Sequence, residues 1–415
     1  MPERVAHLDA VHARPSSPVS TSERVAHLDG LRCVACTLVI CFHLTSVAID
    51  TAGDPVPEAA FPNVPLLFAR AGRPVVTFFF VLSGFAAALD LQRQSDGPRL
   101  KSAVEFVGRR AARLLPAYYA ALAAFVVATK VGDEAPSDTT WLCWVSVLGL
   151  FGPWVPVKHC DTTLAVCLYA PGWFVQSFVW VLIMFSVAYN PILASTRAGG
   201  WAVTASWLAG FTLLDLVVGV LSFTVLRDSA QLIYVFPPGR LVQFLMGTLS
   251  ALLLDAAPAA VAEWPGWWAV ADASLLALPC AWTYSARAGL VLATPTCVYV
   301  AASLADARTA RASLTSRALA HASLVALAPA SFAAYIFQGA ARAVVMHGGA
   351  AAAGARVSTR PAGALASLLL SWGVGVLWSE HAERPLAAIA LGALRSAAKP
   401  PAEAAPLLPK TIPPT

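Results

Sequence analysis

The sequence predicts an all-α fold, a polytopic transmembrane bundle of about ten helices whose N- and C-termini both lie in the cytoplasm. The first observation behind this prediction is composition, because 58% of the 415 residues are hydrophobic and only 12% are charged. Soluble domains carry about 25% charged residues, so this chain could not cover a water-facing surface in the usual way. The second observation is that the apolar residues gather in runs of about 20, the length that crosses a bilayer as a helix.

Ten apolar runs reach this length or come close to it. They are 31–49, 73–91, 114–130, 172–193, 201–226, 238–256, 266–284, 288–304, 324–346 and 362–379. The loops that follow the second and the eighth run are rich in arginine, and the positive-inside rule places such loops in the cytoplasm. Ten spans that start from a cytoplasmic N-terminus put both loops and the C-terminus on that side.

The chain is expected to divide into a polar N-terminal tail (1–25), a transmembrane domain (26–388) and a Pro- and Ala-rich cytoplasmic tail (389–415). The arginine clusters lie beside membrane spans and no soluble domain is left over, which argues against a nucleic-acid partner. Cys33 and Cys36 form a C-x-x-C inside the first span without a second pair, so no metal site is predicted. The protein is therefore an integral, multi-pass membrane protein, and its sequence does not indicate which membrane holds it.

The first span contains two ionisable residues, Arg32 and His43, which are 11 residues apart. This separation is about three helical turns, so both side chains project from one face, about 16 Å apart along the axis. An arginine at a helix end can simply extend its charge to the interface, and a buried histidine can simply bond a neighbouring carbonyl. Ionisable groups at membrane depth are more often functional. Because an imidazole exchanges protons near neutral pH, His43 is the candidate general base, with Arg32 as a second catalytic candidate on the same face.

A second candidate group precedes the third span, where Arg109, Arg110 and Arg113 follow one another closely. On a helix Arg110 and Arg113 project together because they are three residues apart. Two interpretations stay open. The arginines anchor the end of a helix at the inner leaflet, or their guanidinium groups bind the phosphates of a cytosolic donor.

Four further residues are weaker candidates for substrate contact or structural support. Ser83 precedes Gly84 inside the second span, a small pair that favours close helix packing. Trp173 opens the fourth span, where tryptophan commonly marks the membrane interface. Tyr335 lies in the ninth span, and Glu383 lies in the Glu-Arg-Pro that follows the last one.

These motifs, in this order, resemble membrane acyltransferase family three, the type that O-acetylates surface glycans and peptidoglycan. The resemblance covers about residues 26–388 and rests on motifs that the chain carries as follows: Leu-Asp-Gly-Leu-Arg at 28–32 with Asp29, the Arg32-x10-His43 spacing, Phe-Phe-Val-Leu-Ser-Gly-Phe at 79–85, Arg110-x-x-Arg113-x-x-Pro116, Arg240 with Gly247, and Glu383-Arg384-Pro385. It implies a bundle of about ten helices, a cytosolic acyl-coenzyme A donor and an acceptor hydroxyl. It also implies that His43 is the base and that Arg32, Arg110 and Arg113 handle the donor.

The chain departs from the family pattern at several acidic or basic positions. An aspartate of the family is replaced by Thr77, a glutamate of the fourth span by Phe178, a glutamate of the sixth span by Gln243, and a histidine of the ninth span by Gln338. The Arg–His pair is kept, whereas its acidic partners are depleted. The depletion bears on which acceptor is used and, to a lesser degree, on activity.

The function that follows is a membrane O-acyltransferase that moves an acyl group, with acetyl as the first expectation, from acyl-coenzyme A to a hydroxyl of a carbohydrate or lipid. Acetyl-coenzyme A enters as a co-substrate, and no bound cofactor is expected. One alternative is a proton-coupled transporter that uses His43 and Asp215 as a relay. Another is a non-catalytic scaffold of the same family. A cavity that joins Arg32, His43 and Arg113 is expected for the enzyme, and a filled interior for the scaffold.

Overall fold

The computed structural model describes residues 26–50, 66–92, 100, 102–131, 141–155, 158–159, 162–163, 169–224, 230–276, 296, 298, 313–353 and 361–397, and all structural statements concern these residues. The long helices are α2 (Ala26–Asp50), α3 (Leu66–Gln92), α4 (Ala103–Val131), α6 (Trp173–Thr224), α8 (Pro237–Ala256), α14 (Ser331–Ala353), α15 (Pro361–Trp378) and α16 (Arg384–Ala397). The short helical elements are α5 (Trp141–Leu148), η2 (Gly152–Trp154), η3 (Ala170–Gly172), α7 (Ala230–Val235), α9 (Ala259–Ala262), α12 (Leu314–Leu319), α13 (Ala322–Leu327), η5 (Ala328–Ala330) and η7 (Ser379–Glu383). Two-residue strands, β1 (Lys158–His159) and β2 (Thr162–Thr163), pair antiparallel. Apart from this small hairpin, the predicted all-α fold is confirmed.

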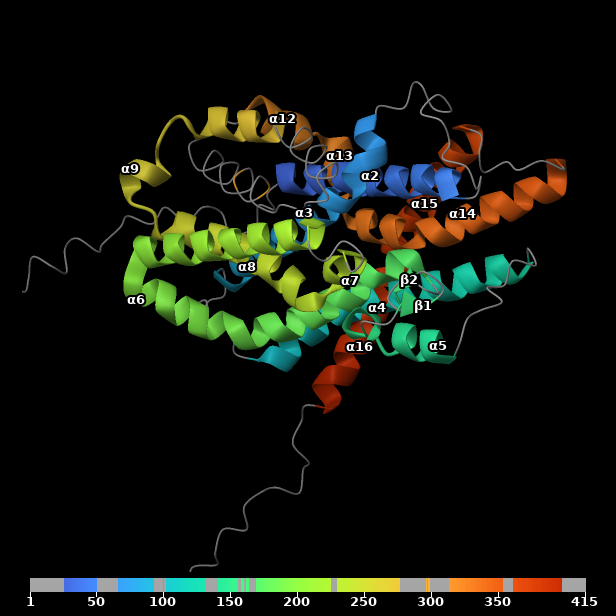
Figure 1. Ribbon diagram of the computed structural model, residues 1–415, viewed down its shortest axis with the longest axis horizontal. Coiled ribbons are helices and arrows are strands. Elements are labelled where there is room, and N and C mark those ends of the chain that lie inside the picture. The colour runs from blue at the N-terminus through green and yellow to red at the C-terminus, as the bar shows by residue number, and fades with distance from the viewer. Residues whose placement is uncertain are drawn as a thin grey trace, which may run out of the picture.

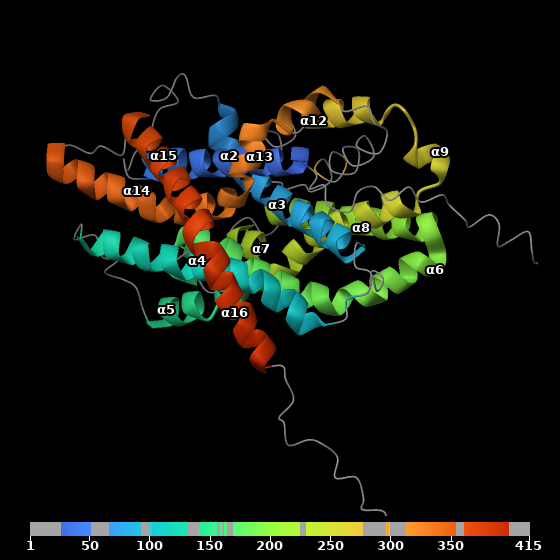
Figure 2. The same cartoon turned by 180° about the vertical axis from the view of Figure 1, so that it is seen from behind.

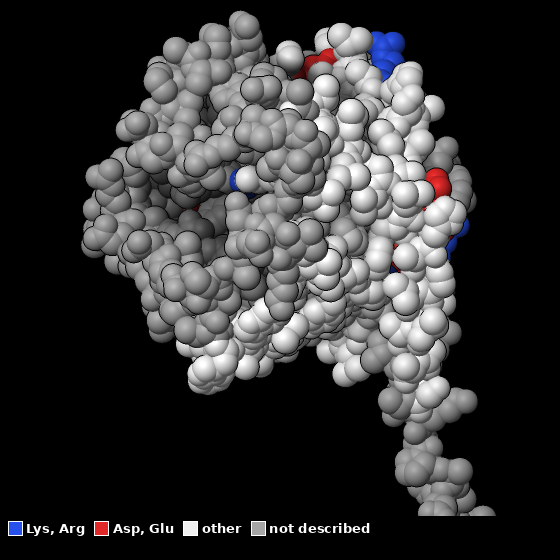
Figure 3. Space-filling view, turned by 90° about the vertical axis from the view of Figure 1, so that its right-hand side faces the viewer, with Lys and Arg blue, Asp and Glu red and all other residues white. Residues whose placement is uncertain are grey.

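Six segments of the described chain are long and apolar enough to cross a membrane, which confirms a polytopic helical protein. They are Ala26–Leu44, Val75–Gln92, Ala103–Thr129, Ala170–Leu221, Ala322–Met346 and Gly363–Ala393. Figure 3 shows one face on which almost all the described side chains are uncharged, as contact with lipid requires. The predicted span 238–256 coincides with α8, whereas residues 277–284 of the predicted span 266–284 and nearly all of 288–304 lie outside the described residues. The count of ten spans and the cytoplasmic termini therefore stay predictions.

The predicted spans 172–193 and 201–226 belong to one long helical element, α6, which bends sharply at Gly200. This glycine has a φ of 62° and a ψ of −149°, a conformation that is accessible essentially to glycine alone. Figure 1 shows the consequence, because the two arms of α6, in green, fold back beside each other. Each of the two predicted spans thus corresponds to one arm.

The C-terminal helices continue further than the sequence predicts. Helix α15, the π turn η7 and helix α16 follow one another without a break from Pro361 to Ala397. Figure 2 shows them as one long red rod that crosses α4. The rod runs through both the predicted end of the last span at residue 379 and the predicted start of the cytoplasmic tail at residue 389. It also packs α16 and η7 against α4.

Helices α2 and α14 lie side by side and run in the same direction. The Cys33 thiol donates to the Leu324 carbonyl at 3.1 Å, and the Cys36 thiol donates to the Ser331 carbonyl at 2.9 Å. Along both segments the contacts advance in the same order, since Cys33 meets Leu324 and Cys36 meets Ser331. Helix α2 therefore runs parallel to the α13–α14 segment. The Cys36 thiol thus joins α2 to α14, and the Cys33 thiol joins α2 to the preceding α13.

Helices α3 and α8 approach so closely that backbone touches backbone. A Cβ atom added at Gly84 would overlap the Phe244 carbonyl oxygen, and one added at Gly247 would overlap the Val81 carbonyl oxygen. The Thr248 hydroxyl also donates to the Gly84 carbonyl at 3.1 Å. Close packing was the simpler interpretation of the Ser83-Gly84 pair, and the structure confirms it.

Replacing Gly84 with alanine is expected to lower the melting temperature of the detergent-solubilised protein clearly. The added methyl group meets backbone atoms of α8, which cannot rotate away as a side chain can. Overpacking of this kind costs about 1–3 kcal/mol or more. The melting temperature is measured by fluorescence-detected size-exclusion chromatography after heating. The matched control is Gly373→Ala on α15, where nothing lies within 4 Å of the added atom. An equal melting temperature for the two variants would contradict the close contact of α3 and α8.

Candidate active site

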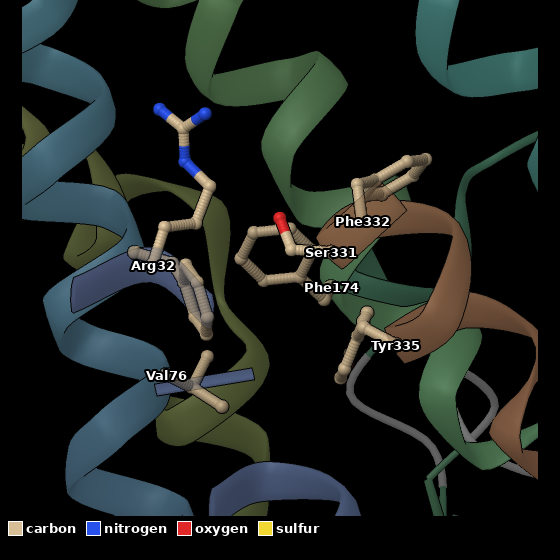
Figure 4. Close-up of a pocket in the computed structure, with 7 residues that line it drawn as sticks. Arg32, Val76, Phe174, Ser331, Phe332 and Tyr335 are labelled. Atoms are coloured by element: carbon tan, nitrogen blue, oxygen red, sulfur yellow. The ribbon is translucent and has the colours of Figure 1, made fainter. Parts of the chain in front are cut away.

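A small pocket lies where α2, α3, α6 and α14 meet. Its cavity volume is about 50 Å³, and it is lined by Arg32, Val76, Phe79, Phe174, Ser331, Phe332 and Tyr335. This is space for a few water molecules rather than for a coenzyme. Figure 4 shows Arg32 on one side of the pocket, its side chain extending upward, and Ser331, Phe332 and Tyr335 of α14 on the opposite side. Arg32 lines this pocket whereas His43 and Arg113 do not, so this pocket is not the cavity that was expected to join all three.

Arg32 is held by its own helix. Its Nη1 lies 3.4 Å from the Asp29 Oδ1, one turn earlier on α2. The Asp29 side chain is only 13% exposed and that of Arg32 is 38% exposed, so the pair is half-buried. The second carboxylate oxygen of Asp29 is buried and has no hydrogen-bond partner among the described residues. Asp29 therefore orients the guanidinium at the edge of the pocket and keeps one oxygen available for a further donor.

Tyr335 lines the pocket with its ring and uses its hydroxyl elsewhere. The hydroxyl donates to the Pro171 carbonyl at 3.1 Å, and the ring packs edge-on against Phe174 with 5.6 Å between centroids. Pro171 lies in η3, directly before α6. Tyr335 thus fixes the start of α6 against α14, which makes it a supporting residue of the pocket wall.

His43 lies further along the α2 face that carries Arg32. Its ring packs edge-on against Phe42, with 5.2 Å between centroids. Arg342 of the neighbouring helix α14 is near enough for its charge to act on the imidazole. The structure therefore brings the predicted base to a guanidinium that the sequence analysis did not single out. One signal could have found it, because polar residues recur along one face of α14 at positions 331, 335, 338 and 342.

The three arginines of α4 have partners of their own. Arg110 donates from Nη2 to the Asp90 Oδ2 of α3 at 3.3 Å, and its guanidinium carbon lies 3.8 Å from the centre of the Phe106 ring. Arg109 lies 3.8 Å from Glu105. Arg113 is exposed, and its charge interacts with that of Glu383 in η7.

These arginines lie at a distance from the pocket. Phe79 lines the pocket, and Asp90, the partner of Arg110, follows it on α3 by 11 residues. That separation is about 16 Å along the helix axis. The Arg32 pocket and the arginines of α4 are therefore two separate sites, which lie at different heights along α3. Ser83 is half-buried between them and does not line the pocket.

A buried polar network joins α3, α6 and α8. Arg240 is 3% exposed, and it donates to the Tyr234 carbonyl at 2.7 Å, the Thr77 hydroxyl at 3.2 Å and the Gln243 Oε1 at 2.7 Å. The Gln243 amide nitrogen in turn donates to the Asp215 Oδ1 at 3.0 Å. Two of the departures from the family pattern, Thr77 and Gln243, therefore both contact Arg240. The carboxylate nearest to this cation in the network is Asp215, reached through the Gln243 amide.

Aromatic rings complete the surroundings of Arg240. Its guanidinium carbon lies 4.3 Å from the centre of the Tyr234 ring, 5.4 Å from that of Phe80 and 5.5 Å from that of Trp173. Rings at such distances stabilise a cation through their π faces. Trp173 is buried in this arrangement, at 4% exposure, rather than exposed at an interface. Trp173 is followed directly by Phe174, which lines the pocket. The Arg240 network therefore supports the pocket wall that α6 forms.

The fold and this site define a multi-pass integral membrane protein with a polar site inside a helical bundle. A family model described as an acyltransferase domain matches residues 25–376 of the 415. The chain belongs to acyltransferase family 3, as its motifs predict. Members of this family are acyltransferases, so the protein is an enzyme that transfers acyl groups other than aminoacyl groups. No curated protein and no solved structure matches the chain.

Proposed function

We propose that this enzyme is a membrane O-acyltransferase that moves an acyl group, acetyl first of all, from acyl-coenzyme A to a hydroxyl of a carbohydrate or lipid. The observation that carries the proposal is the parallel pairing of α2 with α14. It sets Arg32 beside Ser331 and Tyr335 in one pocket, and further along the same pair of helices it brings His43 within range of the charge of Arg342. In this proposal the transmembrane domain has ten spans, and both termini lie in the cytoplasm.

The chemistry proposed for His43 is general base catalysis. The imidazole takes the proton of the acceptor hydroxyl while the hydroxyl oxygen forms a bond to the thioester carbonyl carbon. The carbon–sulfur bond then breaks, and the imidazolium returns the proton to the leaving thiolate, which gives free coenzyme A and an ester. Arg342 lies beside this reaction and offsets the negative charge that grows on the carbonyl oxygen.

The donor is proposed to enter along the arginines of α4. Guanidinium groups bind phosphate oxygens through paired hydrogen bonds, and Arg109 and Arg113 are the exposed members of the group. Arg110 is tied to Asp90, which holds the group against α3. A ligand that reaches from these arginines to the α2–α14 interface must be long and narrow. Acyl-coenzyme A has that shape, with its phosphates at one end and the thioester at the end of a flexible arm.

Of the two alternatives, the transporter would use His43 and Asp215 as a relay. In the structure Asp215 accepts a hydrogen bond from Gln243 in the α6–α8 network, whereas His43 lies on α2, where the charge of Arg342 on α14 acts on it. The two groups thus belong to different helix interfaces, which favours the acyltransferase over a relay. A catalytically inactive scaffold predicts that the donor is not bound, and that difference can be tested directly.

Replacing Arg113 with alanine is expected to weaken the binding of radiolabelled acetyl-coenzyme A to the purified protein by about tenfold. The exposed guanidinium contributes a charged hydrogen bond to phosphate of about 1.5–3 kcal/mol, and each 1.4 kcal/mol is a factor of ten. Binding is measured by equilibrium dialysis in detergent. The matched control is Arg384→Ala, an exposed arginine of α16. The donor assignment fails if the unaltered protein does not retain the label, or if the two variants bind it equally.

A further inference from the structure

Helix α14 carries a buried amide without hydrogen bonds. The Gln338 side chain is 3% exposed, and neither its Oε1 nor its Nε2 has a hydrogen-bond partner among the described residues. Buried polar groups in folded proteins are nearly always paired, because an unpaired one loses its bonds to water without replacement. Both amide atoms of Gln338 therefore need a partner that the described residues do not supply, either a ligand or a water molecule.

The place of Gln338 on α14 is informative. It follows Ser331 and Tyr335, which line the pocket, and precedes Arg342, whose charge acts on His43. The spacings of four, three and four residues put all four side chains on one helical face. Along the axis Gln338 lies about 10 Å from Ser331 and about 6 Å from Arg342. The unpaired amide is thus located between the pocket and the proposed base.

The ligand must both accept and donate a hydrogen bond at this point. The acylated end of acyl-coenzyme A offers a thioester carbonyl oxygen, which accepts, and a nearby secondary amide N–H of the pantetheine arm, which donates. These two groups match the Nε2–H and the Oε1 of one glutamine amide. A water molecule could pair with the same two atoms, and the experiment below separates the two cases.

We propose that Gln338 is a catalytic residue whose Nε2–H binds the carbonyl oxygen of the transferred acyl group, while its Oε1 accepts from the pantetheine amide. The inference rests on the proposed function, since it takes the donor and His43 from there. As the acceptor oxygen bonds the carbonyl carbon, negative charge moves onto the carbonyl oxygen and strengthens the bond from Nε2. As the carbon–sulfur bond breaks, the carbonyl double bond forms again and the negative charge passes to the leaving sulfur. A donor placed in this way lowers the barrier because it is already oriented.

The test compares Gln338→Leu with Gln338→His in the full chain, in detergent, with acetyl-coenzyme A and a membrane extract as acceptor source. Leucine has a similar volume and removes an unpaired polar group, a change that leaves stability equal or higher. We therefore expect an unchanged or raised melting temperature together with a kcat lower by about 10²–10³-fold, the usual loss of one oxyanion donor. Histidine keeps an N–H donor, so Gln338→His should keep most of the kcat. Gln92→Leu, at the end of α3, is the control that should keep full activity.

Two results for Gln338→Leu would overturn the inference. A kcat equal to that of the unaltered protein would show that the amide pairs only with water. A lowered melting temperature with a proportionate loss of active protein would show a structural role instead. If His43→Ala is inactive while Gln338→Leu is fully active, only this inference fails. If the unaltered chain transfers no acetyl group, the proposed function fails and this inference with it.

Discussion

Replacing His43 with alanine is expected to lower the rate of acyl transfer by about 10²–10⁴-fold, the usual contribution of a positioned general base. The loss should fall on kcat, because the imidazole acts on the proton of the acceptor and not on the phosphates of the donor. The rate is measured as release of free coenzyme A thiol by detergent-solubilised protein. Since His43 packs against Phe42 at the α2–α14 interface, the melting temperature is recorded beside the rate.

The matched control for this variant is His381→Ala. His381 lies in the π turn η7 with its side chain 73% exposed, far in sequence from α2 and outside the pocket lining. Its replacement is expected to leave the rate unchanged. A rate for His43→Ala within about twofold of the unaltered enzyme, at equal folded fraction, would exclude His43 as the base, since base removal costs at least about 10²-fold.

Replacing Arg240 with leucine is expected to destabilise the folded protein by about 3–5 kcal/mol, the cost of removing one partner of a buried charge network. The change removes the guanidinium that donates to the Gln243 amide oxygen. Gln243 and the Asp215 carboxylate that it bonds then stay buried without a cation in the network. It also removes the charge that Tyr234, Phe80 and Trp173 surround. The melting temperature in detergent is the measurement.

A second substitution tests whether the network is the cause. Adding Asp215→Leu to Arg240→Leu removes the remaining buried charge, so part of the lost stability should return, because apolar replacement of a whole buried pair is often close to neutral. Arg109→Leu serves as the control. The Arg109 guanidinium is exposed, so its loss should change the free energy of unfolding by no more than about 0.5 kcal/mol. Equal melting temperatures for the single and double variants would contradict a coupling of Asp215 to Arg240 through Gln243.

Much of the fold could be predicted because helix spans depend on local composition. The runs at 73–91 and 324–346 correspond closely to the spans Val75–Gln92 and Ala322–Met346. Two features depend on more than composition. The bend of α6 comes from one glycine with a positive φ. The rod that passes residue 379 continues through Pro385, a residue type that usually interrupts a helix. The π turn Ser379–Glu383 directly precedes it, and the rod packs on α4.

The candidate site could be predicted only in part, because periodicity identifies a helical face and not its partner. The spacing of Arg32 and His43 predicted a shared face of α2, and the structure adds that α14 covers it with Tyr335 and Arg342. In the same way, the sequence showed neutral residues at positions 77 and 243 where acidic partners were expected. It could not show that Asp215 is linked to the same cation through the Gln243 amide, since the bond between Asp215 and Gln243 depends on how the second arm of α6 packs against α8.

The most direct test of the proposed function follows the acetyl group itself. Membranes that contain the unaltered chain are incubated with acetyl-coenzyme A labelled in the acetyl group, and glycan and lipid fractions are separated, with His43→Ala membranes alongside. We predict label in one of these fractions as an alkali-labile ester, formed with equimolar release of free coenzyme A and absent with His43→Ala. Label that enters vesicles without ester formation, or ester that forms equally with His43→Ala, would contradict the account.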